Sequence, residues 1–421
     1  MLAIKPHKIK QRCQLTVPGS KSYTHRILVA SALSDGLCTI ENALFSEDTR
    51  LTMAALRQVG IDIDDSGDGR LAVHGQKGAL QPCGEKIYLA NSGTSMRLLT
   101  AVAALGRGSY TLAGSKRMAR RPLADLVGAL GQIGITAHCE NPSGCPPVHI
   151  RGGTPQGGPV DLDCRTSSQY LSALLLIAPY TRNGLDITVT AGPVSKPYVD
   201  MTVGVMEKFG VTVSRQGYEH FSVSGRQVYR ARSFTVEADC SQAGYFWAAA
   251  AITGSQVKVC GLDGATRQGD VRLTQILESM GCHVLRETDG IQVCGHPLQA
   301  VTVNMSDMPD VVPTLAVVAA FAAGTTVIHG VAHLRAKESD RLAAVVAELK
   351  KMGIRARCDD GILTITGGRP RGTEIETYDD HRIAMSFAVA GLKAPGTVIH
   401  NEGCVEKSFP RFWQVFETLY A

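Results

Sequence analysis

The sequence predicts an α/β protein of two domains, each built from three copies of one strand–helix unit. A chain of 421 residues is longer than one ordinary core can use, and its 44% hydrophobic and 19% charged content is typical of a soluble globular protein. A short strand, a polar turn and a helix of small apolar residues recur six times, at a period of roughly 65 to 75 residues. Because every copy combines strand with helix, we expect helices packed inside or against surrounding sheets.

The first copy lies at residues 17–26, with the sequence VPGSKSYTHR. A strand-like segment ends there, the Pro-Gly pair turns the chain, and hydroxyl side chains with a lysine open a helix. Free backbone N–H groups and the positive end of a helix dipole attract anions, and Lys21 adds a full positive charge. This helix start is therefore a candidate anion site.

The other five copies repeat this order of signals. They begin with IYLANSGTSMR at 87–97, VDLDCRTSSQ at 160–169, FTVEADCSQ at 234–242, VTVNMSD at 301–307 and IETYDDHR at 375–382. A second helical pattern follows most copies, at 51–60, 123–134, 201–210, 271–281 and 342–353. The helices of the first pattern are nearly all small and apolar, so we expect them to be buried. Their six polar starts would form a positive trough for anions in a cleft between the domains.

Composition argues against several classes of protein. The net charge is only +5 and aromatic residues make up 5%, which does not suggest nucleic-acid binding. The longest apolar run, at 315–323, is half of what a membrane span needs. The twelve cysteines are scattered without a C-x-x-C pair, which favours free thiols in a reducing cytoplasm. We therefore expect a cytoplasmic protein without a metal site.

Two charged motifs are harder to explain as surface turns. In RAKESDR at 335–341 five of seven residues are charged, although a capped helix would need only Ser339 and Asp340. In YDDHR at 378–382 an acid, a histidine and an arginine open a helix that continues as a buried apolar run. Both motifs predict polar groups gathered at helix starts.

In this order and spacing the motifs resemble those of the 5-enolpyruvylshikimate-3-phosphate synthase family, the target of the herbicide glyphosate. The resemblance covers essentially the whole chain. It rests on PGSKS at 18–22 with Arg26, NSGTSMR at 91–97, RP at 121–122, SSQ at 167–169, SKPY at 195–198, PD at 309–310, KESDR at 337–341, DHR at 380–382 and Lys407.

The resemblance implies a two-domain inverse α/β barrel of six βαβαββ repeats, three per domain. One domain would consist of residues 1–17 and 238–421, and residues 18–237 would form a domain inserted into it. A double crossover, near 17–20 and 236–240, would serve as the hinge.

The resemblance further implies transfer of the enolpyruvyl group of phosphoenolpyruvate to the 5-hydroxyl of shikimate 3-phosphate, with release of phosphate. The reaction passes through a tetrahedral intermediate and belongs to chorismate and aromatic amino acid biosynthesis. Both substrates are anions, so Arg and Lys in a closing cleft must offset their repulsion. The family works as a monomer without metal or organic cofactor, and we expect neither a nucleic-acid nor a membrane partner.

Two overlapping sets of site residues follow from the resemblance. Shikimate 3-phosphate would be held by Lys21, Ser22, Arg26, Ser167, Ser168, Gln169, Ser195, Asp310 and Lys337. Phosphoenolpyruvate would be held by Lys21, Gly93, Arg121, Gln169, Arg341, Arg382 and Lys407. We expect Asp310 to take the hydroxyl proton and Glu338, alone or with Lys21, to protonate the methylene carbon. Which group protonates the carbon is left open by the sequence.

The chain departs from some family members at two positions. His333 stands where some members carry Asn, which puts a substrate contact there in question, and Leu98 stands where some carry Pro. Gly93 predicts room for glyphosate, but Leu98 bears on the start of the same helix. Sensitivity to glyphosate is therefore a matter for measurement.

Two alternatives are weighed against this interpretation. The related UDP-N-acetylglucosamine enolpyruvyl transferases carry a Cys on a loop near 115–121, whereas this chain has none between Cys83 and Cys139. A non-catalytic anion-binding protein of the same fold would be expected to lack one of four residues that are all present here: Lys21, Asp310, Glu338 and Lys407.

Overall fold

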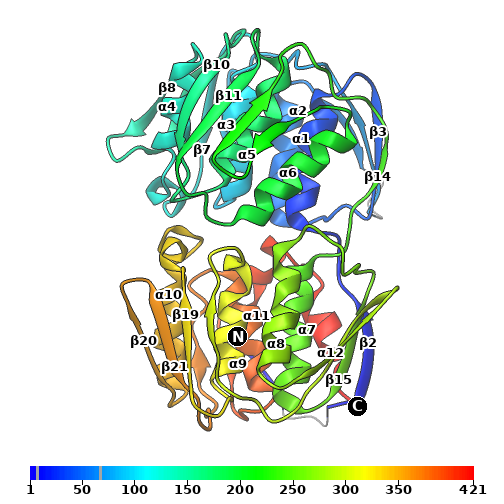
Figure 1. The fold of residues 1–421 in the computed structure, drawn as a ribbon, viewed down its shortest axis with the longest axis vertical. Coiled ribbons are helices and arrows are strands. Elements are labelled where there is room, and N and C mark those ends of the chain that lie inside the picture. Colours follow the sequence, from blue (N-terminus) through cyan, green and yellow to red (C-terminus); the bar gives the residue numbers. More distant parts are fainter. Residues whose placement is uncertain (6–8, 66–68) are drawn as a thin grey trace. The chain divides into compact units, whose positions relative to one another are not determined.

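The computed structural model describes residues 1–5, 9–65 and 69–421. The chain divides into two compact units (Figure 1). Unit 1 consists of Met1–Pro18 and Glu237–Ala421, and unit 2 consists of Gly19–Val236. The chain thus passes between the units after Pro18 and again after Val236. A side chain on Gly19 would collide with the carbonyl oxygen of Asn42, so the first crossing requires glycine. That the crossings act as a hinge stays a prediction.

The described residues form six sheets with one shared topology, a parallel pair extended by antiparallel strands. In unit 2 the sheets are, in spatial order, β14 (Ser233–Thr235), β3 (Leu37–Glu41), β5 (Leu71–His74) and β4 (Asp62–Asp65); β6 (Lys86–Tyr88), β7 (Ser109–Ala113), β9 (Cys145–Arg151) and β8 (Thr136–Asn141); and β10 (Gly158–Asp163), β11 (Leu185–Ala191), β13 (His220–Val223) and β12 (Ser214–Gln216). In unit 1 they are β2 (Arg12–Thr16), β15 (Gln256–Cys260), β17 (Gly290–Cys294) and β16 (His283–Glu287); β18 (Thr302–Asn304), β19 (Thr325–His329), β21 (Ile362–Thr366) and β20 (Arg355–Asp359); and β22 (Glu374–Ile375), β23 (Val398–Ile399) and β1 (Leu2–Ala3). The predicted α/β fold of six repeats is confirmed.

Two opening strands lie just before the points where the chain passes from one unit to the other. Strand β2, which precedes the first helix, pairs in parallel with β15 of unit 1, with Leu15 opposite Val259. Strand β14 pairs in parallel with β3 of unit 2, with Phe234 opposite Ile40. In the first and fourth copies the opening strand therefore lies in one unit and the helix that follows it in the other.

The helices of the first pattern are buried, as predicted. They are α1 (Lys21–Leu33), α3 (Gly93–Ala103), α5 (Gln169–Ile177), α7 (Cys240–Thr253), α9 (Val312–Ala319) and α11 (His381–Gly391). Every residue of α11 is buried, and so is every residue of α7 except Thr253. Helix α11 packs against α7 and α9, and α3 packs against α5 (Figure 1). Runs of Ala allow the helices to approach closely, so polar groups at their starts are brought near one another.

The helices of the second pattern differ from prediction mainly at their starts. They are α2 (Glu47–Gln58), α4 (Ala124–Gln132), α6 (Lys196–Lys208), α8 (Leu273–Ser279) and α10 (Arg341–Lys351), and α12 (Phe412–Glu417) follows near the C-terminus. Short 3-10 helices lie at η1 (Met118–Arg120), η2 (Ala178–Tyr180), η3 (Gly269–Arg272), η4 (Pro309–Val311), η5 (Ala332–Ala336) and η6 (Glu402–Lys407). Helix α2 starts earlier than its apolar period indicates because Ser46 and Thr49 form a capping box. Among the described residues, no helix has the length and apolarity that a membrane crossing requires.

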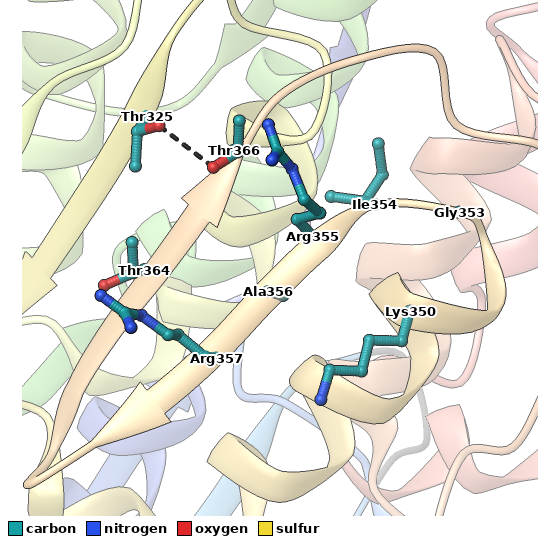
Figure 2. A pocket seen from close by; sticks show the side chains of 9 residues that line it. All are labelled: Thr325, Lys350, Gly353, Ile354, Arg355, Ala356, Arg357, Thr364 and Thr366. Atoms are coloured by element: carbon teal, nitrogen blue, oxygen red, sulfur yellow. Dashed lines mark hydrogen bonds between the residues drawn. The ribbon is translucent and has the colours of Figure 1, made fainter.

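A groove of about 770 Å³ runs over the outer face of the β18–β19–β21–β20 sheet (Figure 2). Leu363 and Ile365 of β21 point to the core, so Thr364 and Thr366 face outward with Arg355 and Arg357 of β20. The lining contains none of the residues predicted for the site. This groove is therefore separate from the polar groups described next.

Candidate functional site

A group of charged side chains in unit 1 surrounds Arg341. Its Nε donates to Oδ2 of Asp380 at 2.9 Å, and its Nη1 donates to Oδ1 of Asp310 at 2.9 Å. Nη2 donates to Oε2 of Glu338 at 2.8 Å. Arg341 and Asp380 are enclosed, whereas the Asp310 side chain is 20% exposed and the Glu338 side chain 10%. One buried guanidinium thus orients two carboxylates that keep access to solvent.

A second guanidinium, that of Arg382, completes this group. Its Nη2 donates to Oδ2 of Asp310 at 2.9 Å, and its Nη1 donates to the hydroxyl of Tyr245 at 3.1 Å. Asp310 therefore accepts from Arg341 at one oxygen and from Arg382 at the other. The Nε of Arg382 is buried and has no hydrogen-bond partner among the described residues. A buried donor of this kind fits an acceptor supplied by a bound anion.

Two helix starts place the arginines. Arg341 is the first residue of α10, whose N-cap Asp340 accepts from the backbone N of Ala343 at 3.1 Å. Arg382 stands in the first turn of α11, whose N-cap Asp380 accepts from its backbone N at 2.9 Å. Asp is a preferred N-cap residue and its charge suits the helix dipole. The N-cap residues Asp340 and Asp380 therefore fix the backbone positions from which both arginine side chains extend.

The charge states of this group follow from its contacts. Burial alone would lower the pKa of Arg341, but Asp380, Glu338 and Asp310 outweigh it and raise the pKa above the usual value. Burial acts in the same way on Arg382, whose pKa is raised by Tyr245 and Asp310. The nearby His333 behaves differently, because burial, followed by the charge of Lys337, lowers its pKa to about 3. Both arginines are therefore cations at neutral pH, and His333 is uncharged.

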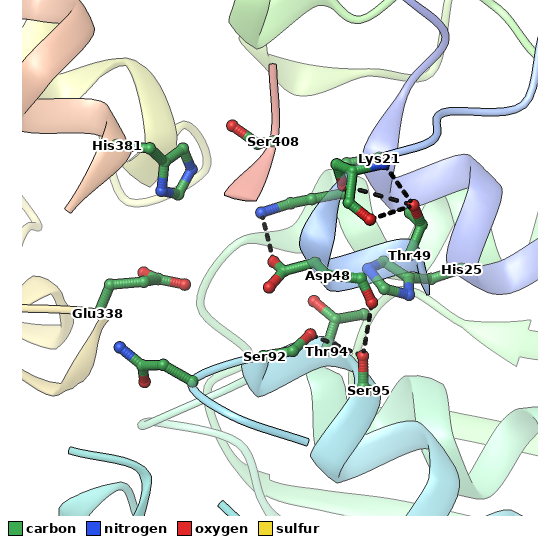
Figure 3. A network of polar contacts seen from close by, with 12 residues as sticks. Lys21, His25, Asp48, Thr49, Ser92, Thr94, Ser95, Glu338, His381 and Ser408 are labelled. Carbon is green, nitrogen blue, oxygen red and sulfur yellow. Dashed lines mark hydrogen bonds and ion pairs between the residues drawn. The ribbon is translucent and has the colours of Figure 1, made fainter. Parts of the chain in front are cut away.

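In unit 2, Lys21 is held by a carboxylate. Its Nζ lies 3.0 Å from Oδ2 of Asp48, at the start of α2, and both side chains are buried (Figure 3). Ser20 is the N-cap residue of α1, since its hydroxyl accepts from the backbone N of Tyr23 at 3.4 Å. Lys21 is therefore the first residue of α1, and the Asp48 carboxylate is its counter-charge.

A chain of hydroxyl groups ties α1, α2 and α3 together beneath this lysine. Thr52 of α2 contacts Nδ1 of His25 at 2.8 Å and the hydroxyl of Ser95 at 2.7 Å. Ser95 also contacts Ser92 at 2.6 Å, and it donates to the carbonyl of Asp48 at 3.3 Å (Figure 3). Buried hydrogen bonds thus hold the N-terminal parts of α1, α2 and α3 together.

The start of α3 brings two guanidiniums together at Gly93. A side chain on Gly93 would collide with the terminal nitrogens of Arg97 and Arg121 and would lie 2.7 Å from Cζ of Arg121. Arg121 donates from Nη1 to the carbonyl oxygen of Asn91 at 2.9 Å. Arg97 donates to the side chain of Gln169 at 3.3 Å, and its buried Nε has no hydrogen-bond partner in the part of the chain that the structure describes. Two cations around a glycine fit a small anion.

Arg26 is used within the protein. Its Nε donates to Thr202 at 2.7 Å, and its other nitrogens donate to the carbonyl oxygens of Ser22 and Tyr198 at 2.9 and 3.1 Å. Burial lowers its pKa to about 10, against small opposing effects of nearby tyrosines. Arg26 therefore joins α1 to α6, and it orients the backbone carbonyl groups of Ser22 and Tyr198.

The start of α5 contributes three polar side chains to unit 2. Gln169 donates to Thr94 at 3.0 Å, and Ser168 donates to the carbonyl of Ser195 at 3.3 Å. The Ser167 hydroxyl accepts from the backbone N of Gln169 at 3.2 Å. Ser195 adopts a left-handed φ of 58°, and its buried hydroxyl has no hydrogen-bond partner within residues 1–5, 9–65 and 69–421. These contacts join α3, α5 and α6 at their N-terminal ends.

The predicted site residues fall into two hydrogen-bonded groups, one in each unit. Of the remaining predicted residues, Lys407 is buried at the end of η6 and Lys337 is half-buried at the end of η5. The prediction missed several residues that take part in these groups, among them the charged or aromatic residues Asp48, Arg97, Tyr245 and Asp380. Arg97 and Asp380 lie inside the motifs at 91–97 and 380–382, next to residues that the sequence predicts for the site. That neighbourhood is a signal by which the sequence could have identified them. The described residues contain no cluster of His, Cys, Asp and Glu suited to a metal ion.

Comparison with known proteins relates these two groups to a family. The family model described as EPSP synthase (3-phosphoshikimate 1-carboxyvinyltransferase) matches residues 6–416. The chain belongs to the EPSP synthase family. This membership confirms the predicted resemblance, and it makes the chain a transferase of the shikimate pathway.

Individual EPSP synthases are similar over nearly the whole length. The 3-phosphoshikimate 1-carboxyvinyltransferase of Syntrophobacter fumaroxidans is 44% identical over 97% of both chains. The chloroplastic enzyme of Arabidopsis thaliana is 41% identical over 96% of this chain and 82% of its own. Among solved structures, EPSP synthase from Acinetobacter baumannii matches with a TM-score of 0.85 and 30% identity, over 100% of this chain and 98% of that one.

Proposed function

We propose that this chain is a 3-phosphoshikimate 1-carboxyvinyltransferase, which transfers the enolpyruvyl group of phosphoenolpyruvate to the 5-hydroxyl of shikimate 3-phosphate and releases phosphate. The observation that carries the proposal is the match of residues 6–416 to the EPSP synthase family. The two groups of cations at helix starts support it, since both substrates are multiply charged anions.

In this proposal phosphoenolpyruvate binds to five cationic residues, a glycine and a glutamine. The residues are Lys21, Gly93, Arg121, Gln169, Arg341, Arg382 and Lys407. Support comes from the convergence of Arg97 and Arg121 at Gly93 and from the buried, unpartnered Nε of Arg382 among the described residues. A phosphate or carboxylate accepts paired N–H bonds from a guanidinium, which suits arginine better than lysine.

Shikimate 3-phosphate binds mainly to the helix starts of unit 2. The residues are Lys21, Ser22, Arg26, Ser167, Ser168, Gln169, Ser195, Asp310 and Lys337. Ser195 supports this set, because its hydroxyl is buried without a hydrogen-bond partner among the described residues. Arg26 acts beneath Ser22 and Tyr198, whose carbonyl oxygens accept its N–H groups. Within this set, Arg26 also orients these two neighbours.

Acid–base roles fall to the carboxylates beside Arg341. Asp310 takes the proton of the 5-hydroxyl as the oxygen adds to C2 of phosphoenolpyruvate, and Glu338, alone or with Lys21, gives a proton to the methylene carbon. In the second half the roles reverse: the methyl group of the tetrahedral intermediate returns its proton to Glu338 or Lys21 as the double bond forms again, and the C–O bond to phosphate breaks as Asp310 gives its proton to the leaving phosphate. Contacts with two guanidiniums favour the carboxylate form of Asp310, which a base requires.

The setting of the enzyme is part of the proposal. We infer a cytoplasmic monomer with small anionic substrates as its only partners, acting in aromatic amino acid biosynthesis. The twelve cysteines are all free, which agrees with a reducing compartment. The crossings after Pro18 and Val236 act as the hinge on which the units close over the first substrate.

Phosphate release tests the proposal directly. The protein should release phosphate from phosphoenolpyruvate when shikimate 3-phosphate is added, and remain inactive with UDP-N-acetylglucosamine. Release only with the second acceptor would assign the related transferase activity. Tight binding of shikimate 3-phosphate without any phosphate release would instead indicate a non-catalytic anion-binding protein.

A further inference from the structure

Glu348 is a buried carboxylate that the proposed reaction does not use. It lies on α10, about two helical turns after Arg341 and on the same side of the helix, and it is fully enclosed. An enclosed carboxylate requires hydrogen-bond donors. Oε1 accepts from the hydroxyl of Tyr378 at 2.7 Å, and Oε2 accepts from the backbone N of Glu376 at 3.1 Å and from Lys351 at 2.9 Å.

Two of these three donors belong to residues 376–380, which we call the 376–380 turn. Within it, Tyr378 and Asp379 both have a φ of 55°, a left-handed conformation that residues with a side chain rarely adopt. Two such residues in succession need contacts that hold them. Tyr378 as a whole residue is 44% exposed, so burial alone does not fix the turn. The hydroxyl bond to Glu348 is one contact that holds it, beside the bond from Nδ2 of Asn401 to Oδ1 of Asp379 at 3.1 Å.

The same turn leads directly into the charged group around Arg341. Asp380 follows Asp379, and its carboxylate accepts from Nε of Arg341 and from the backbone N of Arg382, each at 2.9 Å. Helix α10 is thus joined to the 376–380 turn at two points, by Glu348 near its end and by Arg341 at its start. A shift of the turn at the first point would move the Asp380 carboxylate, which accepts from the Arg341 guanidinium and caps the helix on which Arg382 stands.

We propose that Glu348 and Tyr378 are positioning residues for Arg341 and Arg382. They hold the left-handed residues of the 376–380 turn, and Asp380 is thereby set to accept from the Arg341 guanidinium and to cap the helix that carries Arg382. Burial and the bond to Glu348 both raise the pKa of Tyr378, so its hydroxyl remains a donor throughout the neutral range. The inference rests on the proposed function in one respect only, that these arginines bind phosphoenolpyruvate.

Steady-state kinetics of Tyr378→Phe test the inference, because this change removes the hydroxyl and keeps the ring. We expect the KM for phosphoenolpyruvate to rise about five- to twentyfold, with the KM for shikimate 3-phosphate within about twofold of wild type. Glu348→Gln should show a selective rise of the same kind, since its amide oxygen can replace only one carboxylate oxygen and the amide nitrogen cannot accept from the donor at the other position. A merely structural role would not separate the two substrates.

One control variant matches these changes. Tyr110→Phe removes a tyrosine hydroxyl that donates to the carbonyl of Gln81 in unit 2, and it should keep the wild-type KM values. The inference would be overturned if Tyr378→Phe left the KM for phosphoenolpyruvate unchanged. It would also be overturned if Tyr378→Phe and Tyr110→Phe raised that KM equally. A wild-type protein that releases no phosphate would overturn the proposed function instead.

Discussion

Lys21 and Asp48 form an ion pair that is almost closed to solvent. The distance from Nζ to Oδ2 is 3.0 Å, and the side chains are 9% and 2% exposed. Removal of one member of such a pair leaves the other charge buried, which typically costs about 3–5 kcal/mol. Because Lys21 also belongs to the proposed substrate site, effects on stability and on catalysis must be separated.

A pair of variants separates them. Lys21→Met should lower the free energy of unfolding by about 3 kcal/mol and also reduce turnover, because Asp48 loses a counter-charge and the substrates lose a cation. Adding Asp48→Asn removes the stranded carboxylate, so most of the stability should return while turnover stays low. Denaturant unfolding and phosphate release measure the two effects. Recovery of turnover in the double variant would show that Lys21 acts only as a partner for Asp48.

Gly93→Ala should weaken phosphoenolpyruvate binding without unfolding α3. The added methyl group would displace the ends of Arg97 and Arg121, whereas Ala favours the helix more than Gly does. We expect the KM for phosphoenolpyruvate to rise about tenfold or more, with the thermal midpoint unchanged or higher. Gly128→Ala in α4 is the matched control, because its added methyl meets only open space. Equal KM values in the two variants would contradict an anion site at Gly93.

Asp310→Asn and Glu338→Gln should each reduce turnover about 10²–10⁴-fold, since each change removes a group assigned to proton transfer. The amides keep the size of the side chains, so stability changes reveal how much Arg341 depends on their charge. Glu278→Gln, which alters an exposed pair with Arg286, serves as the control and should leave turnover unchanged. If either site variant stays within about tenfold of wild type, its assigned role is wrong.

The repeats could be predicted because their signals are local. A polar helix start before a small apolar run is visible in sequence, and so were Gly93, Asp310 and the charges at 337–341. The partner of Lys21 could not be found in this way, because Asp48 lies on another helix and reaches the lysine only through packing of α1 on α2. The use of Arg26 by Thr202 is equally non-local. Sequence shows which donors exist, and packing decides which are taken by the protein.

Stability should depend on pH through His333. Its pKa in the folded protein is lowered to about 3 by burial and then by Lys337, against an ordinary value of 6.5. Between these values the unfolded chain binds the proton and the folded one does not, so stability is greatest above pH 6.5 and falls as the pH is lowered toward 3. The slope from this one group reaches about 1.4 kcal/mol per pH unit.

His333→Asn should flatten that dependence, because asparagine does not titrate. Denaturant unfolding at about pH 6.5 and at about pH 4.5 would show a smaller loss of stability in the variant than in wild type, by one proton's contribution at most. Other groups that titrate in this range are common to both proteins and cancel in the comparison. His74→Asn, at an exposed histidine, should keep the wild-type slope. An identical slope in His333→Asn would mean that His333 takes up its proton equally well in the folded and the unfolded protein. The assignment of an enclosed, neutral imidazole beside Lys337 would then be wrong.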